Sequence, residues 1–280
     1  MSAPRPMSRR RLVAAGAAAV VAAGVTGIPA HAASNTTTAG DSAAKPTIVL
    51  VHGAFADGSS WSPVIERLQC AGYTVRSVAN PLRGLTTDAA YVRSVLTSIT
   101  GPVVLAGHSY GGAVITAAAA GIPQVKALVY VAAFVPDEGE VLGELSARYP
   151  GSQLQPALTA IPAPAADGSQ GLDLYIRDDL FPGVFAQDVP AATARTLASV
   201  QRPLSASSFT DTAPAAAWRT IPSWNLVSTR DQVIPPELQR FQAQRAGSRT
   251  VEVASSHLAL YSHPGAVSDL IKAAARSVGR

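Results

Sequence analysis

A serine framed by glycines, in the stretch Gly107-His108-Ser109-Tyr110-Gly111, is the clearest sign of chemistry in this sequence. An apolar run at 103–106 leads into it and an alanine-rich run follows it. A strand that turns sharply into a helix presents a serine hydroxyl at the strand end, and the glycines leave room for that strained turn. The helix would also direct its amide groups and positive end toward a reacting carbonyl. The pattern therefore predicts that Ser109 is a nucleophile.

A serine hydroxyl needs a base to remove its proton and an acid to orient that base. His257 is the predicted base, because it follows the apolar run 250–253 after a short polar turn. Asp231 is the predicted acid, because it follows the apolar run 224–228 and the chain order is then Ser, acid, His. Asp137, which follows an earlier apolar run, is the alternative acid.

The other four histidines are expected to have no catalytic role. His31 precedes the expected folded domain, and His52 ends the first expected strand, where it would shape a loop. His108 adjoins the serine and is expected to pack or to form a hydrogen bond locally. His263 stands next to a proline at an expected helix start, where capping or surface exposure is the simpler interpretation.

Backbone amides are expected to stabilise the oxyanion that forms when Ser109 attacks a carbonyl. One is the amide of Tyr110, the residue after the serine. The other belongs to the loop after the first expected strand, where Gly53 permits a sharp path. Ala54 is the predicted donor in that loop, and Phe55 is the alternative. The side chains of Phe55 and Tyr110 are expected to line an apolar substrate pocket.

Alternating apolar runs and helical stretches are expected to position these residues. Such alternation predicts an α/β fold, with a mostly parallel sheet flanked by helices on both sides. The expected strands are 47–51, 73–78, 102–106, 127–133, 224–228 and 250–253. The expected helices are 62–71, 87–99, 112–120, 237–246 and 264–277. Ligands bind at the carboxyl ends of strands in such sheets, which is where the candidate residues fall.

One interval interrupts this alternation, at about residues 137–219. It shows no clear strand–helix pair, but a Pro-, Ala- and Gly-rich stretch at 150–171, followed by amphipathic pieces at 172–185 and 191–200. An insertion of this length in a compact domain is usually functional. We expect residues 137–219, the cap, to fold over the carboxyl edge of the sheet.

The first residues are typical of an export signal. A twin arginine within Ser8-Arg9-Arg10-Arg11 precedes a mild apolar stretch, and Ala30-His31-Ala32 supplies small residues for a signal peptidase. Residues 1–32 are therefore predicted to be a twin-arginine signal peptide, residues 33–44 a flexible lead-in, and residues 45–280 the folded domain. The apolar stretch is shorter than the roughly 20 residues that span a bilayer, so no stable membrane anchor is expected.

The basic isoelectric point of about 9.5 belongs to that leader. Four arginines are the only charged side chains before Asp41, and without them 18 basic side chains balance 18 acidic ones. The folded domain therefore has no electrostatic basis for binding nucleic acid.

Cys70 is the only cysteine, so no disulfide can form within the chain. It lies in an expected helix between Leu68 and Ala71 and is interpreted as a buried space-filling residue. No cysteine–histidine cluster suggests a metal site, and no G-x-G-x-x-G sequence follows a strand to hold a nucleotide. No metal and no cofactor are expected.

From about Lys45 onward the chain resembles the α/β-hydrolase superfamily. The motifs that carry the resemblance are Val51-His52-Gly53-Ala54 with Trp61, Gly107-His108-Ser109-Tyr110-Gly111-Gly112, Asp231 with Ile234-Pro235 and Phe241, and Ser256-His257-Leu258. Within the superfamily they are most similar to a small capped branch that includes plant methylesterases, hydroxynitrile lyases and bacterial esterases.

The resemblance implies a serine hydrolase that cleaves small to medium apolar esters through Ser109, Asp231 and His257, and the leader implies that it is secreted. The lyases of this branch carry a lysine after the catalytic histidine and a threonine in the oxyanion loop, whereas this chain has Leu258, assigned to the substrate pocket, and Gly53. These differences favour ester hydrolysis. Two alternatives remain: a slow or non-catalytic small-molecule receptor of the same fold, and a perhydrolase or haloperoxidase-like enzyme that uses peroxide in place of water.

Overall fold

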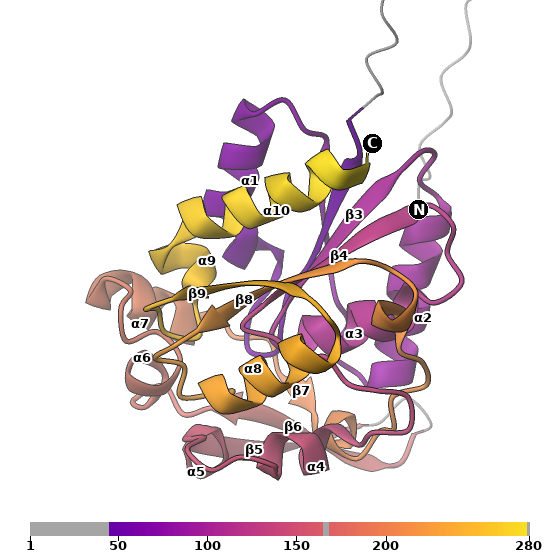
Figure 1. Ribbon diagram of the computed structural model, residues 1–280. Coiled ribbons are helices and arrows are strands. Elements are labelled where there is room, and N and C mark those ends of the chain that lie inside the picture. Colours follow the sequence, from indigo (N-terminus) through magenta and orange to yellow (C-terminus); the bar gives the residue numbers. More distant parts are fainter. Residues whose placement is uncertain (1–44, 165–167, 279–280) are drawn as a thin grey trace, which may run out of the picture. The chain divides into compact units, whose positions relative to one another are not determined.

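Six parallel strands form the central sheet of the computed structural model, which describes residues 45–164 and 168–278 (Figure 1). Their order is β2-β1-β3-β4-β8-β9. The strands are β1 (Thr47–Val51), β2 (Val75–Val78), β3 (Val103–His108), β4 (Val125–Val131), β8 (Ser223–Ser228) and β9 (Arg249–Val253). The inner strands β1, β3, β4 and β8 are buried along almost their whole length, which explains their continuous apolar sequences.

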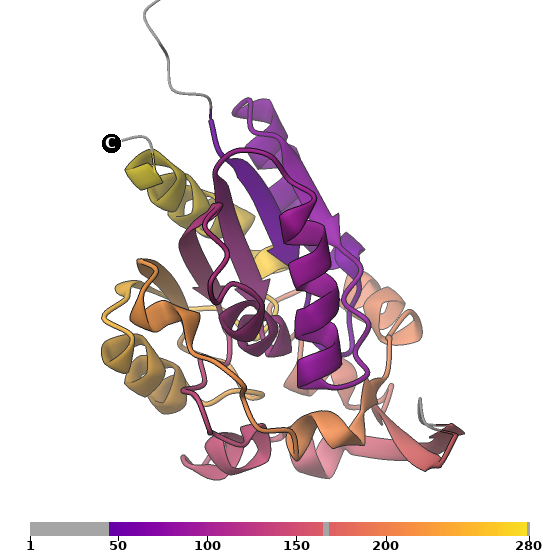
Figure 2. The ribbon, with the colours of Figure 1, turned by 90° about the vertical axis from the view of Figure 1, so that its right-hand side faces the viewer.

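Helices cover both faces of this sheet, so the predicted α/β class is confirmed (Figure 2). One face packs against α1 (Ser62–Cys70) and α10 (Pro264–Val278). The other packs against α2 (Leu85–Thr97), α3 (Tyr110–Ala118) and α8 (Pro236–Arg245). Successive residues of β1 alternate between the two faces: Ile48 and Leu50 join the first layer, and Val49 and Val51 join the second.

The cap lies between β4 and β8 and contains a second, antiparallel sheet of order β5-β6-β7. Its elements are α4 (Leu142–Ala147), α5 (Leu154–Ala157), β5 (Leu158–Pro164), β6 (Gln170–Ile176), α6 (Phe181–Val184), α7 (Ala191–Ser199), β7 (Leu204–Ser205), η2 (Ala206–Phe209) and η3 (Ala217–Arg219).

The strands of the cap add to the sequence analysis, which found no clear strand–helix pair in this interval and assigned no strand there. β5 falls inside the proline-rich stretch, and Pro162 and Pro164 lie within it. A proline cannot donate to a strand ladder, but β5 is an edge strand with β6 on one side only, so prolines are tolerated there. The piece at 172–185 likewise divides between β6 and the short helix α6.

Hydrogen bonds attach the cap to the loops that follow β1 and β2. The Phe55 amide donates to the Arg202 carbonyl at 3.1 Å, and the Arg202 guanidinium donates to the Asn80 carbonyl at 3.0 Å. The Ser205 amide also donates to the Leu82 carbonyl at 2.9 Å. Both loops begin at the carboxyl ends of their strands, so these contacts place this part of the cap at the predicted edge of the sheet.

Two predictions concern other parts of the chain. The interpretation of Cys70 as a buried residue is wrong, because its side chain is exposed. Helix α1 buries Val64 and Leu68, which are four residues apart on one face, and Cys70 lies off that face. The predicted signal peptide, 1–32, and lead-in, 33–44, lie outside the described residues. Within 45–164 and 168–278, no helix is both long and apolar enough to cross a membrane.

Candidate active site

Ser109 occupies a strained turn between β3 and α3. Its φ of 54° lies in the left-handed region, which residues other than glycine rarely adopt, and its ψ is −125°. The end of β4 and the loop after it hold this conformation, because the Ser109 amide donates to the Val131 carbonyl and the Phe134 amide donates to the Ser109 carbonyl. Surrounding structure of this kind is what maintains a strained residue at a functional site.

Three glycines around the serine have no room for a side chain. A Cβ on Gly107 would lie 2.5 Å from the Gly111 carbonyl oxygen, and one on Gly111 would lie 2.5 Å from the Val51 carbonyl oxygen. A Cβ on Gly53 would lie 2.6 Å from the Ser109 Cβ. These glycines therefore allow the ends of β1 and β3 and the start of α3 to meet at the serine.

His257 and Asp231 form a fully buried pair at the same edge of the sheet. The His257 Nδ1 lies 2.7 Å from the Asp231 Oδ2. The other oxygen, Oδ1, accepts from the amides of Val233 and Ile234 at 2.7 and 3.0 Å. These donors replace the water that the buried carboxylate has lost. Because a carboxylate accepts, Nδ1 carries the proton and Nε2 keeps its lone pair.

The free imidazole nitrogen is available to a substrate-side group. His257 Nε2 is buried and has no hydrogen-bond partner among the described residues. The Ser109 hydroxyl also forms no hydrogen bond with the part of the chain that the structure describes, so no direct bond joins it to His257 Nε2. The ring of His108, the residue before the serine, packs against the His257 ring with 4.7 Å between centroids and a tilt of 50°. Catalytic hydrogen bonds are often long without substrate and tighten in the complex.

The hydrogen bonds of the oxyanion loop distinguish its two candidate donors, the amides of Ala54 and Phe55. Phe55 has a φ of 59°, and this turn directs its amide to the Arg202 carbonyl, so that amide is occupied. The amides of Ala54 and Tyr110 donate to no acceptor among the described residues. Ala54 and Tyr110 both line the cavity in front of Ser109. The geometry therefore favours Ala54 over Phe55.

Two further histidines are buried and shape the site without contacting Asp231. The Asn80 amide donates to Nε2 of His52, so Nδ1 of His52 donates to the Gly53 carbonyl at 2.9 Å. Burial lowers the pKa of His52 to about 4. His108 Nε2 donates to the His257 carbonyl at 2.9 Å, and burial lowers the pKa of His108 well below its ordinary value. Both rings are therefore neutral at neutral pH.

The contact of His108 differs from the expected local hydrogen bond. Its partner lies 149 residues away in the sequence, so the residue next to the serine holds the backbone of the predicted base. The partly exposed His263 contacts Ser262 and lies 3.8 Å from Asp188.

Asp137, the alternative acid, lies in a different environment. It forms an ion pair with Arg219 at 2.8 Å, and its amide is bound by the Glu140 carboxylate. Asp231, not Asp137, is the carboxylate that the structure places against His257.

Sequence reasoning missed three residues that support the pair. The side-chain amide of Gln239 donates from Nε2 to the Asp231 Oδ2 at 2.8 Å and to the Ile234 carbonyl. The Phe185 ring lies 4.8 Å from the His257 ring, and Asp188 accepts from the Ser256 amide at 2.9 Å. Gln239 was detectable as a polar residue on the first turns of the helix after Asp231. The two cap residues carried no comparable signal.

Two small cavities flank Phe55. The first, here the Ser109 cavity, has core walls of Ala54, Phe55, Ser109, Tyr110, Phe134 and Val233. Its cap walls are Leu142, Leu154, Leu204, Ser208 and Phe209. Its free volume of about 20 Å³ holds about one water, so binding of an ester requires cap side chains to move.

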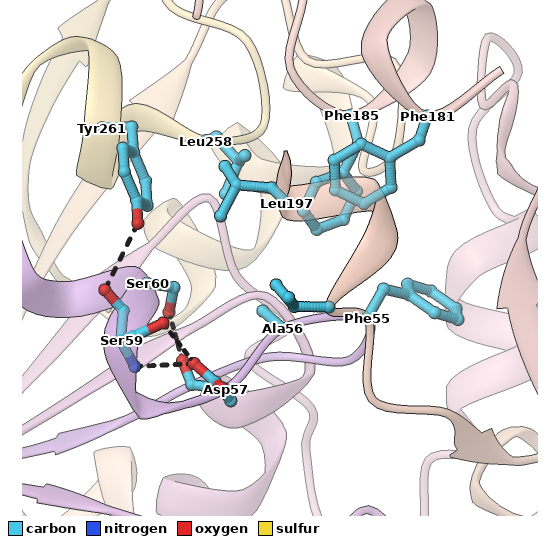
Figure 3. Close-up of a pocket in the computed structure, with 11 residues that line it drawn as sticks. Phe55, Ala56, Asp57, Ser59, Ser60, Phe181, Phe185, Leu197, Leu258 and Tyr261 are labelled. Carbon is cyan, nitrogen blue, oxygen red and sulfur yellow. Dashed lines mark hydrogen bonds between the residues drawn. The ribbon is translucent and has the colours of Figure 1, made fainter. Parts of the chain in front are cut away.

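The second, here the Leu258 cavity, lies where the cap meets the residue after His257 (Figure 3). Leu197, Phe181 and Phe185 of the cap face Ala56 and Leu258 of the core. The three predicted pocket residues therefore divide between the cavities: Tyr110 lines the first, Leu258 lines the second and Phe55 lines both.

No group of three His, Cys, Asp or Glu side chains within the described ranges is arranged to hold a metal ion. The site chemistry described above rests on protein side chains and amides.

The model of the alpha/beta hydrolase family matches residues 48–270, an interval that contains Ser109, Asp231 and His257. The chain is 37% identical over 107 residues to a carbendazim hydrolyzing esterase of Nocardioides sp. (strain SG-4G). That match covers 34% of this chain and only 44% of the esterase. It is 27% identical over 250 residues to salicylic acid-binding protein 2 of Nicotiana tabacum, a match that covers 77% of this chain and 92% of the tobacco protein.

The crystal structure of polyneuridine aldehyde esterase shares the fold. The two structures superpose with a TM-score of 0.72 at 19% sequence identity, covering 82% of this chain and 99% of the esterase. The predicted superfamily and its methylesterase- and esterase-containing branch agree with these matches.

Substitution of Gly111 by alanine tests the close approach at the serine. The new Cβ would collide with backbone, so we expect the midpoint of thermal unfolding to fall by about 6 °C or more, or folding to fail. Gly265→Ala is the control, because no atom lies within 4 Å of a Cβ there, and it should change the midpoint little. Equal effects of the two substitutions would contradict the interpretation.

The buried neutral His52 predicts a loss of stability in mild acid. Below its unfolded pKa of 6.5, the unfolded chain binds a proton that the folded protein does not bind until about pH 4. The free energy of unfolding therefore falls as the pH falls through this window. Between pH 7 and pH 5, His52 should contribute about 2 kcal/mol of that decrease.

Urea unfolding of the wild type and of His52→Gln at both pH values measures this contribution. The variant should lose less stability between pH 7 and pH 5, whatever its stability at pH 7. His108 titrates in the same direction in both proteins, so the difference isolates His52. An identical decrease in the two proteins would show that His52 is not held neutral by burial.

Proposed function

We propose that this chain, which belongs to the alpha/beta hydrolase family, is a serine carboxylesterase that acts on small to medium apolar esters. The observation that carries the proposal is the buried Asp231–His257 pair, whose unpaired Nε2 lies at the same sheet edge as the strained Ser109. Relatives that are esterases support hydrolysis of an ester bond. Which ester is cleaved belongs to the proposal.

The first half of the proposed reaction forms an acyl-enzyme. His257 Nε2 removes the Ser109 proton as Oγ attacks the ester carbonyl, and the Asp231 carboxylate stabilises the imidazolium that results. The amides of Ala54 and Tyr110 donate to the oxyanion, aided by the positive end of α3. The carbonyl then re-forms, the bond to the alkoxy oxygen breaks, and Nε2 protonates the departing alcohol.

The second half repeats these steps with water. His257 removes a proton from water as its oxygen attacks the acyl carbon, and the same two amides hold the second oxyanion. The bond between Oγ and the acyl carbon then breaks, and the imidazolium returns its proton to Ser109. The acid is released, and the serine and the histidine regain their starting states.

Two positions favour hydrolysis over cyanohydrin cleavage, the other chemistry of the branch that the sequence resembles. A Cβ at Gly53 would overlap the Ser109 Cβ, so a threonine has no room in this oxyanion loop. Leu258 is buried in an apolar cavity, where the cyanide-binding lysine of the lyases would stand. An uncharged leaving group such as an alcohol suits these surroundings.

Export through the twin-arginine machinery, with cleavage by a signal peptidase after Ala32, is part of the same proposal. Its basis is the sequence of residues 8–32, with paired arginines, a mild apolar stretch and small residues at the cleavage site. The partners of the folded domain are then its small-molecule substrate alone.

A fluorophosphonate probe tests whether Ser109 is a working nucleophile. The wild type should be labelled, because Oγ attacks phosphorus and displaces fluoride, and Ser109→Ala should not be labelled. Ser94→Ala is the matched control, since Ser94 is an exposed helix serine, and it should be labelled like the wild type. A wild-type protein that binds esters without labelling would instead be a receptor.

Substitution of the two candidate acids tests which one orients His257. Asp231→Asn should lower kcat for a p-nitrophenyl ester by about 10⁴-fold, because an amide cannot stabilise the imidazolium and can favour the wrong tautomer. Asp137→Asn loses only a contact with Arg219 and should stay within about twofold of the wild type. Comparable losses in both variants would contradict the assignment. Adding peroxide as the acceptor in the same assay distinguishes a perhydrolase.

A further inference from the structure

A buried serine of the cap points to a substrate group beyond the ester itself. Ser208 belongs to η2, has no exposed surface and lines the Ser109 cavity. Its hydroxyl has no hydrogen-bond partner among the described residues. The other cap residues of this cavity are apolar: Leu142, Leu154, Leu204 and Phe209. An unpaired hydroxyl in such a wall destabilises the folded protein unless something pairs with it.

Tyr110, which lines the same cavity as Ser208, forms a hydrogen bond to a buried carboxylate. Tyr110 Oη donates to Asp88 Oδ2 at 2.8 Å, and the Arg83 amide donates to Asp88 Oδ1 at 3.0 Å. Asp88 is fully buried in the first turn of α2, where the helix dipole favours negative charge. Burial raises the pKa of Asp88, while these two donors lower it.

The hydrogen-bonding capacity of Tyr110 and Ser208 decides what this wall of the cavity can recognise. Because the Tyr110 proton is given to Asp88, the Tyr110 oxygen offers only lone pairs to its other neighbour. Burial and then Asp88 raise the pKa of the Tyr110 phenol. The unpaired Ser208 hydroxyl can donate one hydrogen bond and accept another. The complementary group is therefore a hydroxyl, which can also donate and accept.

The geometry around His257 indicates which half of the ester reaches Ser208. His257 protonates the departing alcohol in the proposed reaction, so the alcohol lies on the His257 side of the scissile bond. Leu258 and Phe185, which packs on the His257 ring, line the Leu258 cavity. Tyr110 and Ser208 line the other cavity. The acyl group therefore faces Ser208.

We propose that the Ser109 cavity selects acyl groups that carry a hydroxyl, which forms a hydrogen bond with the Ser208 hydroxyl in the cavity wall that also contains Tyr110. This specificity rests on the proposed esterase function. A carboxylate on the acyl group is disfavoured, because no lysine or arginine lines the cavity and Asp88 lies behind Tyr110. The substrate class is thus neutral hydroxyacyl esters.

Matched esters that differ by one hydroxyl test the proposal. The p-nitrophenyl esters of butanoate, 2-hydroxybutanoate and 3-hydroxybutanoate share one leaving group, and kcat/KM is measured for each. For each protein, the kcat/KM of a hydroxylated ester is divided by the kcat/KM of the butanoate ester. Comparing this ratio between proteins cancels the intrinsic reactivity of the esters. For at least one hydroxylated ester, Ser208→Ala should lower this ratio by about tenfold.

Ser207→Ala is the control for Ser208→Ala. Ser207 is the exposed neighbour on the same turn, and its hydroxyl already pairs with Ser205 at 2.9 Å. Its ratio should equal that of the wild type. Ser208→Cys provides a second variant of similar shape, and because a thiol is a weak hydrogen-bonding group its ratio should also fall.

The outcomes separate this inference from the proposed function. If the wild type hydrolyses butanoate but both Ser208 variants keep the wild-type ratios, the hydroxyl subsite is wrong and the esterase stands. If the fluorophosphonate probe does not label the wild type and none of the three esters is hydrolysed, the proposed function fails first. If Ser208→Ala does not fold, the ratio in Ser208→Cys decides.

Discussion

The backbone around Ser109 is packed so closely that three neighbouring positions cannot carry a Cβ atom. Gly53, Gly107 and Gly111 bring the end of β1, the end of β3 and the start of α3 within contact of one residue. The serine itself takes a left-handed φ that these contacts and the loop after β4 maintain. The placement of the oxyanion loop and of the helix terminus follows from this convergence.

Electrostatics at the site depend on keeping most buried groups uncharged. His52 and His108 are neutral because burial opposes protonation, and each donates its one ring N–H to a backbone carbonyl. Asp231 alone among the groups that contact His257 carries a charge, and backbone amides and Gln239 compensate it. A positive charge that develops on His257 therefore has one defined partner.

The cap contributes both to the walls of the pocket and to the arrangement of the core. Its Arg202 carbonyl occupies the Phe55 amide, which leaves the preceding amide of Ala54 for an oxyanion. Its Asp188 carboxylate holds the Ser256 amide next to the predicted base, and its Phe185 ring packs on that base. Movement of the cap would therefore alter the candidate catalytic groups as well as the volume of the cavity.

The sequence by itself indicated the order of the core strands and helices, the turn at Ser109 and the chain order of the candidate serine, acid and base. These depend on local signals: continuous apolar runs, helical spacing, and glycines where a backbone approach excludes a side chain. Only the tertiary structure decided between Asp231 and Asp137, and between Ala54 and Phe55, because those choices depend on which distant groups already hold each carboxylate or amide. The antiparallel strands of the cap, the bond from His108 to His257 and the exposure of Cys70 also required it. Pairing partners and exposed faces are set by residues far away in the chain, which no local pattern records.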